Sequence, residues 1–226
     1  MLLSLPKDEL QSYTSAQLNY FFPDRDTVKL ADYNNIVNLA LDRIDFCFGK
    51  TSHSRYNNGG QTILNHLYTD QYLMFVWFLA NTFWKEKGKN IISEKLYCLN
   101  KALHAFDCMY DTGLPDIFLI FHAAGTMLGK AKYDDYFVAL QGCTIGSHKG
   151  KYPVMGKGVS LTAHTAIIGN CTVGNRVSLS AYTSVFEKDI PDDTVVSADK
   201  ETGQKSFRYS KNPYAQQFFN VDLMNA

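Results

Sequence analysis

A six-residue repeat in the second half of this chain restricts its possible folds more than any other feature. Every sixth residue is aliphatic, at Met155, Leu161, Ile167, Val173, Leu179 and Val185. A second set of small or β-branched residues follows each of the first five after four positions: Val159, Thr165, Cys171, Val177 and Thr183. A period of six fits neither a helix stripe, which repeats every 3.6 residues, nor an isolated strand, which alternates every two.

This period predicts a β-helix, in which tight corners separate short strands and each coil stacks on the one before. The aliphatic residue would point into the coil. An evenly spaced β-sandwich is the alternative, and five successive matches to the phase argue against it. Extended backward, the phase passes through Met127, Tyr133, Ala139 and Ile145. The unit that begins at Ile145 is four residues too long, so we expect the sequence SHKGKYPV to project as a loop from a corner.

Charge and cysteine usage exclude several classes of protein. The 226 residues hold 22 basic and 22 acidic side chains, so no basic field exists to attract nucleic acid or an anionic membrane. The five cysteines form no CxxC pair, which favours free thiols in a reducing cytoplasm over disulfides or zinc. The longest apolar run, residues 72–84, falls short of the roughly 20 residues that span a bilayer. We therefore expect a cytoplasmic protein with no membrane span and no nucleic-acid partner.

The first half of the chain lacks the repeat and favours helices. Apolar spacing predicts them over residues 7–22, 32–48 and 62–86, with a Gly-rich loop at 49–60 and a further helix that begins near Ser93 as N-cap.

The predicted fold class is thus α+β, with three parts along the chain. They are a helical domain at residues 1–113, a parallel β-helix at 114–198 and a tail at 199–226. The tail is polar and aromatic, and the sequence leaves open whether it forms a cap or a subunit contact.

Several motifs together resemble the serine O-acetyltransferase family of hexapeptide acyltransferases. They are a helical first half, His122-Ala-Ala-Gly125 at the junction, Leu140-Gln141 further along the repeat, and one protruding loop. The resemblance covers residues 105–190 in detail and the helical half in architecture only. It implies a left-handed coil, a homotrimer, and acetyl-CoA bound as co-substrate between coils of neighbouring subunits. It implies no metal. Whether the helical half joins two trimers into a dimer of trimers is left open by the sequence.

By this resemblance, His122 is the general base that takes the acceptor's hydroxyl proton during attack on the thioester. An imidazole suits that role because its ordinary pKa lies near neutral pH. The family's upstream orienting carboxylate would correspond to Asp107, with Asp111 and Asp116 close enough to compete. A core histidine at a domain junction, and a helix-terminal aspartate, are the structural alternatives.

The family lines the pantetheine arm with small residues on successive coils. The matching positions here are Gly146, Ala163 and Ala181, and Lys188 is placed to meet the phosphates of coenzyme A. Coil corners also need small residues for purely structural reasons, and isolated lysines are usually just solvated.

The acceptor site departs from the serine-specific pattern. Phe121 stands where those enzymes have Asp, and Lys151-Tyr152 replaces the Arg-His that precedes Pro153. These changes remove bidentate recognition of an amino acid, while the aromatic residues Phe121, Tyr152 and Tyr136 suit a sugar face.

The candidate acceptor-binding residues therefore come from both halves of the chain: Phe121, His148, Tyr152, His66 and Asp70. His66 and Asp70 lie four positions apart on one predicted helix, where a surface pair is the simpler interpretation.

The sequence thus favours an acetyl-CoA-dependent O-acetyltransferase that modifies a sugar hydroxyl in surface polysaccharide. A serine O-acetyltransferase of cysteine biosynthesis, an amino-sugar N-acetyltransferase and a non-catalytic trimeric scaffold are the alternatives. A metal-binding β-helix would need converging histidines, and His122, His148 and His164 do not recur in phase.

Overall fold

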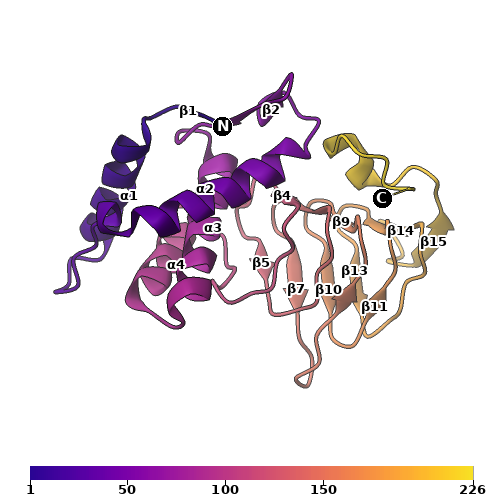
Figure 1. Cartoon of the computed structure of the whole chain (residues 1–226). Helices are drawn as coiled ribbons and strands as arrows, with labels where there is room; N and C mark the ends of the chain where they lie inside the picture. Colours follow the sequence, from indigo (N-terminus) through magenta and orange to yellow (C-terminus); the bar gives the residue numbers. More distant parts are fainter. Residues whose placement is uncertain (226) are drawn as a thin grey trace. The chain divides into compact units, whose positions relative to one another are not determined.

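The structure is a computed structural model that describes residues 1–225, and it divides into two compact units. One unit comprises Met1–Gly49 and His53–Asp111, and the other comprises Lys50–Ser52 and the chain from Thr112 onward. The first is helical and the second is a stack of mostly parallel strands (Figure 1). A helical region followed by a β-helix confirms the predicted fold class.

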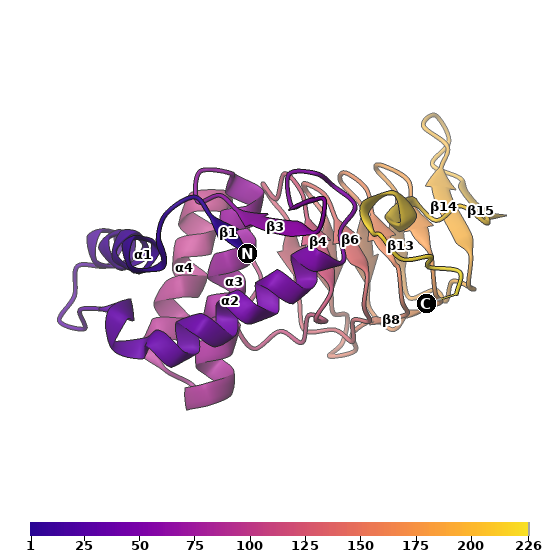
Figure 2. The same cartoon turned by 45° about the horizontal axis from the view of Figure 1, so that its top comes forward.

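The helical unit is built around one buried helix. Its elements are α1 (Lys7–Phe21), the 3-10 helix η1 (Leu30–Tyr33), α2 (Asn34–Gly49), α3 (Thr69–Lys87), α4 (Ile91–His104) and a sheet of β1 (Leu2–Leu3), β3 (Gln61–Leu64) and β2 (Asn57–Asn58). Helix α3 packs against both α2 and α4 (Figure 2) and is buried at every position from Asp70 to Phe83. No helix within residues 1–225 is both long and apolar enough to cross a bilayer.

Two predictions in this unit are wrong in detail. A helix from Thr62 is not formed, because Gln61–Leu64 pairs as β3 with β1 and β2, and β1 lies some 60 residues earlier in the chain. The N-cap of α4 is Asn90 rather than Ser93. The Asn90 side chain accepts a hydrogen bond from the Ser93 N–H at 2.9 Å, a role that asparagine fills as well as serine does.

Three parallel sheets form the sides of the β-helix. The first holds β4 (Phe118–Ile120), β6 (Phe137–Ala139), β9 (Ser160–Leu161), β12 (Ser178–Leu179) and β14 (Thr194–Ala198), with β15 (Lys205–Tyr209) antiparallel at its edge. The second holds β5 (Met127–Leu128), β7 (Thr144–Gly146), β10 (Ala166–Ile168) and β13 (Ser184–Phe186), and the third holds β8 (Val154–Met155) and β11 (Thr172–Val173). Successive coils pair in register, so Ile167 lies between Ile145 and Val185.

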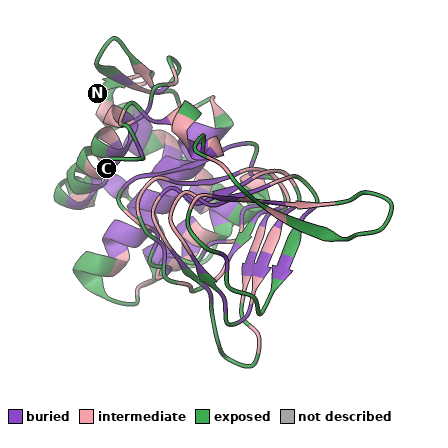
Figure 3. Cartoon of the chain, turned by 90° about the vertical axis from the view of Figure 1, so that its right-hand side faces the viewer, coloured by how far each residue is buried: buried purple, intermediate pink, exposed green. Residues whose placement is uncertain are grey.

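The six aliphatic residues of the repeat all point inward and are at most 3% exposed, which confirms the predicted phase. Figure 3 shows buried and exposed residues alternating along the strands of the β-helix. Beyond Val185 the phase slips by one residue, because the next inward residue is Ile190, five positions later, and the buried Val196 follows it at the normal spacing of six. It slips by one at the other end, where Met127 is exposed and Leu128 is the inward residue. The reason is a coil that is one residue shorter than the repeat.

The predicted projecting loop is a tight hairpin, visible below β7 in Figure 1. His148 and Lys151 exchange two backbone hydrogen bonds of 2.9 and 3.0 Å. Lys149 and Gly150 between them both have positive φ angles, 49° and 74°, as in the two-residue turns that match strand twist.

Candidate functional site

The segment that holds His122 is a widened corner between the first two sheets of the β-helix. In the first coil, residues 121–126 connect Ile120 to Met127. Their register partners in the following coil are Ala139 and Thr144, and only four residues connect those two. The next two coils also use four residues at this corner. The sequence His122-Ala-Ala-Gly125 therefore carries two residues that have no counterpart in the other coils.

His122 lies on the outside of this corner. It is exposed and has a φ of +53°, a left-handed conformation in which histidine is enriched among non-glycine residues. The backbone is anchored on both sides, because the Phe121 N–H donates to Ala139 O at 3.0 Å and the Thr126 N–H donates to Ala123 O at 2.9 Å. His122 is thus a surface residue on a defined turn and not a core histidine.

Two of the predicted coenzyme-binding residues share the corner of His122. Ile120, Leu161 and Leu179 occupy the same position in their respective coils. His122 lies two residues after Ile120, and Ala163 and Ala181 likewise lie two residues after Leu161 and Leu179. Coils stack about 4.8 Å apart, so Ala181 lies three coils and roughly 14 Å along the corner from His122.

Sequence reasoning missed Tyr182, the large exposed residue of this corner. Its ring stacks on His164 at 5.1 Å with an interplanar angle of 13°, and the side chain is 73% exposed. A Cβ atom on Gly142 would lie 2.3 Å from the His164 ring, so this stack requires glycine beneath it. The sequence could have indicated Tyr182, because it directly follows Ala181 and lies one coil after His164.

The remaining predicted residues of the β-helix lie at the opposite end of the same strands. Gly146 ends β7, His148 belongs to the projecting hairpin and Lys188 follows β13. At about 3.3 Å per residue, these short strands hold the two groups roughly 10 Å apart within one chain. A Cβ on Gly146 would make only ordinary contacts, the nearest at 3.6 Å, so packing does not by itself demand glycine there.

The polar groups at this far end already have partners. His148 Nδ1 lies 2.9 Å from Glu187 Oε1, and its ring packs 4.8 Å from the ring of Phe186. Lys188 Nζ lies 4.0 Å from the centre of the Phe207 ring. Tyr152 stays 40% exposed.

Phe121 and Tyr136 are packed rather than open. Phe121 is 7% exposed and its ring lies 4.9 Å from that of Phe218, while the Tyr136 ring lies 5.1 Å from that of Phe219. Phe121 therefore offers no free face to an acceptor, Tyr136 is partly covered, and Tyr152 is the most exposed of the three.

In the helical unit, Asp107 is held by two neighbours. Tyr97 donates to one carboxylate oxygen at 2.7 Å and Lys101 donates to the other at 2.8 Å. Burial acts to raise the pKa of Asp107, but the hydrogen bonds from Lys101 and Tyr97 outweigh it and hold that pKa below its usual value. Asp111 is partly buried in the turn that ends this unit.

His66 and Asp70 do not share a helix face, which corrects that prediction. Helix α3 begins at Thr69, so His66 lies in the preceding turn, where Nδ1 is 2.8 Å from the Ser4 hydroxyl. Asp70 lies in the first turn of α3 and is only 4% exposed.

No group of three or more His, Cys, Asp or Glu side chains within residues 1–225 is arranged to hold a metal ion. The five cysteines are free thiols, and four of them are buried.

Comparisons with known proteins give matches at the level of structure alone. No protein-family model and no curated protein matches the sequence. Serine acetyltransferase from Brucella abortus, solved with coenzyme A, is 16% identical over 93% of this chain and 84% of its own, with a TM-score of 0.65. The Neisseria gonorrhoeae serine acetyltransferase is 16% identical over 92% of this chain and 82% of its own, with a TM-score of 0.64. Serine acetyltransferase isoform 3 from Entamoeba histolytica, solved in complex with cysteine, is 18% identical over 87% of this chain and 72% of its own, with a TM-score of 0.59.

At such identities the likeness establishes architecture. The chain has the fold of the serine acetyltransferases. In this chain a helical region precedes a hexapeptide β-helix, whose first corner is widened and carries the exposed His122.

Proposed function

We propose that the protein is an acetyl-CoA-dependent O-acetyltransferase. The observation that carries this proposal is the corner that displays His122 outward and continues along the coils as Ala163 and Ala181. Small residues leave room there for an extended pantetheine arm. The fold supports the same assignment, since one serine acetyltransferase similar to this chain was solved with coenzyme A.

The chemistry needs one base and one thioester. His122 accepts the proton of the acceptor hydroxyl while its oxygen bonds to the acetyl carbonyl carbon, and general base catalysis of this kind contributes about 10²- to 10⁴-fold. The carbon–sulfur bond then breaks, and coenzyme A leaves as a thiolate that takes up a proton. We favour direct transfer over an acyl-enzyme, because the Cys143 thiol is buried inside the coil, 3.1 Å from Thr162 O.

L-serine is the acceptor that the comparisons support, because the solved structures similar to this chain are serine acetyltransferases. The case for a sugar in polysaccharide biosynthesis rested on exposed aromatic residues, and Phe121 and Tyr136 are packed against the C-terminal segment. A sugar hydroxyl remains the second candidate because Phe121 supplies no carboxylate beside His122, and Lys151 lacks the bidentate geometry of arginine.

We further propose that an upstream carboxylate orients His122, and Asp107→Asn and Asp111→Asn are the two substitutions that test it. A homotrimer belongs to the same proposal. Met127 and Phe186 lie on the outer face of the β5–β7–β10–β13 sheet and are 47% and 52% exposed. Covering them with a second copy would let the His122 corner of one subunit meet the Gly146 and His148 end of the next.

The test is release of free thiol from acetyl-CoA by the purified protein, with L-serine, free sugars and nucleotide sugars as separate acceptors. We expect release with serine, and release lost in His122→Asn. His164→Asn is the matched control, because it removes an imidazole from the same corner. Acetyl-CoA should also raise the melting temperature, as a ligand of the native state does.

Release with sugars and not with serine would replace the acceptor and keep the reaction. No release with any acceptor, together with no thermal shift from acetyl-CoA, would contradict the proposal and favour a scaffold.

A further inference from the structure

The chain turns back along the coils after β15, and residues 210–225 form what we call the C-terminal strap (Figure 1). Backbone hydrogen bonds fix its path. The Ser210 N–H donates to Asp193 O at 2.7 Å, and the Tyr214 N–H donates to the Ser178 hydroxyl at 3.0 Å. The strap is therefore joined to the last coils of the β-helix.

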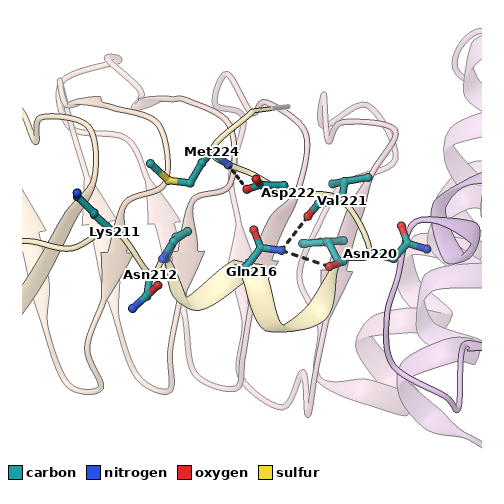
Figure 4. A pocket seen from close by; sticks show the side chains of 9 residues that line it. Lys211, Asn212, Gln216, Asn220, Val221, Asp222 and Met224 are labelled. Atoms are coloured by element: carbon teal, nitrogen blue, oxygen red, sulfur yellow. Dashed lines mark hydrogen bonds between the residues drawn. The ribbon is translucent and has the colours of Figure 1, made fainter.

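Side chains within the strap hold its shape (Figure 4). The Gln216 amide donates to Val221 O at 2.7 Å, and its carbonyl oxygen accepts from the Leu223 N–H at 2.8 Å. The Asp222 carboxylate accepts from the Met224 N–H at 3.0 Å. Leu223 is fully buried. The strap is thus an ordered element with its own internal contacts.

One aromatic residue of the strap, Phe218, packs beside the corner that holds His122, and the next, Phe219, packs at the start of β6. The Phe218 ring lies 4.9 Å from the Phe121 ring at an angle of 36°, and the Phe219 ring lies 5.1 Å from the Tyr136 ring. Phe218 is itself anchored, because its carbonyl oxygen accepts from the Thr51 hydroxyl at 2.8 Å. Pairs of rings at such distances add favourable interaction beyond the burial of their surface.

Phe121 is the last residue before the corner departs from the coil register. Its N–H is held by Ala139 O at 3.0 Å, and His122 follows directly. The other coils have no counterpart to the two extra residues of this corner. Coil-to-coil hydrogen bonds hold its far side, where the Gly142 N–H donates to Ala124 O at 3.0 Å and the Thr126 hydroxyl donates to Leu140 O at 2.7 Å. On the near side of the corner, Phe121 is held by its N–H and by the packing of its ring on Phe218, and the imidazole extends from the very next residue.

We propose that the strap is a positioning element for His122, in which Phe218 fixes Phe121 and thereby directs the imidazole. The inference rests on the proposed function, in which His122 is the base. Catalytic groups are sensitive to such support, because a displacement of about 1 Å can lower a rate by roughly 10²-fold. Phe218 is a positioning residue, since it acts on the reaction only through Phe121.

The kinetic test compares two truncations in the strap. Phe218→Ala should lower kcat by about 10- to 100-fold and change the KM for acetyl-CoA much less. Phe218→Tyr keeps the ring and should restore kcat. Phe219→Ala is the matched control, because it removes a ring of the same size from the strap and leaves the Phe218–Phe121 pair in place. If Phe218→Ala fails to fold, Phe218→Leu, which keeps most of the apolar volume, supplies the comparison.

A second readout does not depend on activity. The chain has six histidines, so the NMR signal of His122 can be assigned by its loss in His122→Asn. We expect Phe218→Ala to shift that signal and Phe219→Ala to leave it unchanged. An unchanged His122 signal in Phe218→Ala, or an equal disturbance in Phe219→Ala, would overturn the positioning role. If the wild type transfers no acetyl group, the proposed function fails while this readout still decides the role of the strap.

Discussion

In the helical unit, one helix is surrounded on all sides, whereas the β-helix has no element longer than five residues and spreads its interior over successive coils. Helix α3 is buried at every position from Asp70 to Phe83, with Phe75, Trp77 and Phe78 at most 1% exposed. In the β-helix, one aliphatic residue and one small or β-branched residue per six-residue unit fill the inside. The difference predicts how far the destabilisation caused by a truncated side chain spreads. Stacked coils contact only their neighbours, whereas a central helix contacts the whole unit.

The largest effect should come from truncation in α3. Phe75→Ala should destabilise the helical unit by about 3–5 kcal/mol, the usual range for loss of a buried aromatic side chain. Amide hydrogen exchange should show protection lost across α2, α3 and α4 together. Tyr20→Ala, which truncates an 84% exposed aromatic residue, should cost about 0.5 kcal/mol or less. Loss of protection confined to α3 would break the comparison.

A truncation inside one coil should be weaker and more local. Leu179→Ala removes a fully buried side chain and should cost about 2–4 kcal/mol. Protection should fall in β12 and in its direct partners β9 and β14, with little change at β4. Uniform loss over all coils, measured by the same exchange experiment, would show that the β-helix unfolds as one block.

The same difference explains what the sequence could predict. Repetition exposed the inside of the β-helix, because the same position recurs six times and a chance match becomes improbable. The slip at Met127 stayed hidden, since Met127 and Leu128 are both apolar and either fits the phase. In the helical unit, β3 was read as helix because its partner β1 is remote in sequence.

For the candidate site, the sequence indicated His122 and the alanine corner, but not the surroundings. The strap contact joins Phe121 to Phe218, almost one hundred residues apart, and no local pattern encodes such a pairing. The partners of Asp107 were equally hidden, although Tyr97 and Lys101 are close in sequence, because their contact requires the chain to turn after α4.

A charged corner contact near the end of the β-helix gives a smaller effect. Arg176 donates two hydrogen bonds to the Asp193 carboxylate, at 2.6 and 3.0 Å, and this holds the pKa of Asp193 below its usual 3.8. Asp193→Asn should cost about 1–2 kcal/mol at neutral pH.

The pH dependence of this contact has a definite sign. A lowered carboxylate pKa contributes stability above the pKa of the unfolded chain, and that contribution is lost as pH falls through the lower folded value. The difference in unfolding free energy between wild type and Asp193→Asn should therefore shrink in acid. Glu201→Gln, a change at an exposed side chain of the β14–β15 turn, should show no such trend.

The smallest expected effect on stability concerns equivalent threonine hydroxyls in two neighbouring coils. Thr183 is fully buried and its hydroxyl has no hydrogen-bond partner within residues 1–225, whereas the Thr165 hydroxyl, one coil earlier, donates to Thr162 O at 2.9 Å. Thr183→Val should be neutral or stabilising by up to about 1 kcal/mol, and Thr165→Val should cost about 1 kcal/mol. Denaturant midpoints would measure both, and equal costs would contradict the difference between the coils.

The most direct test of the central claim, that the widened corner performs acetyl transfer, is the steady-state rate of His122→Asn beside His164→Asn. The account predicts that His122→Asn lowers kcat for acetyl transfer by about 10²-fold or more while acetyl-CoA still raises its melting temperature. His164→Asn, which removes an imidazole that touches no reacting atom, should lower kcat far less. Equal rates in His122→Asn and the wild type would contradict the account.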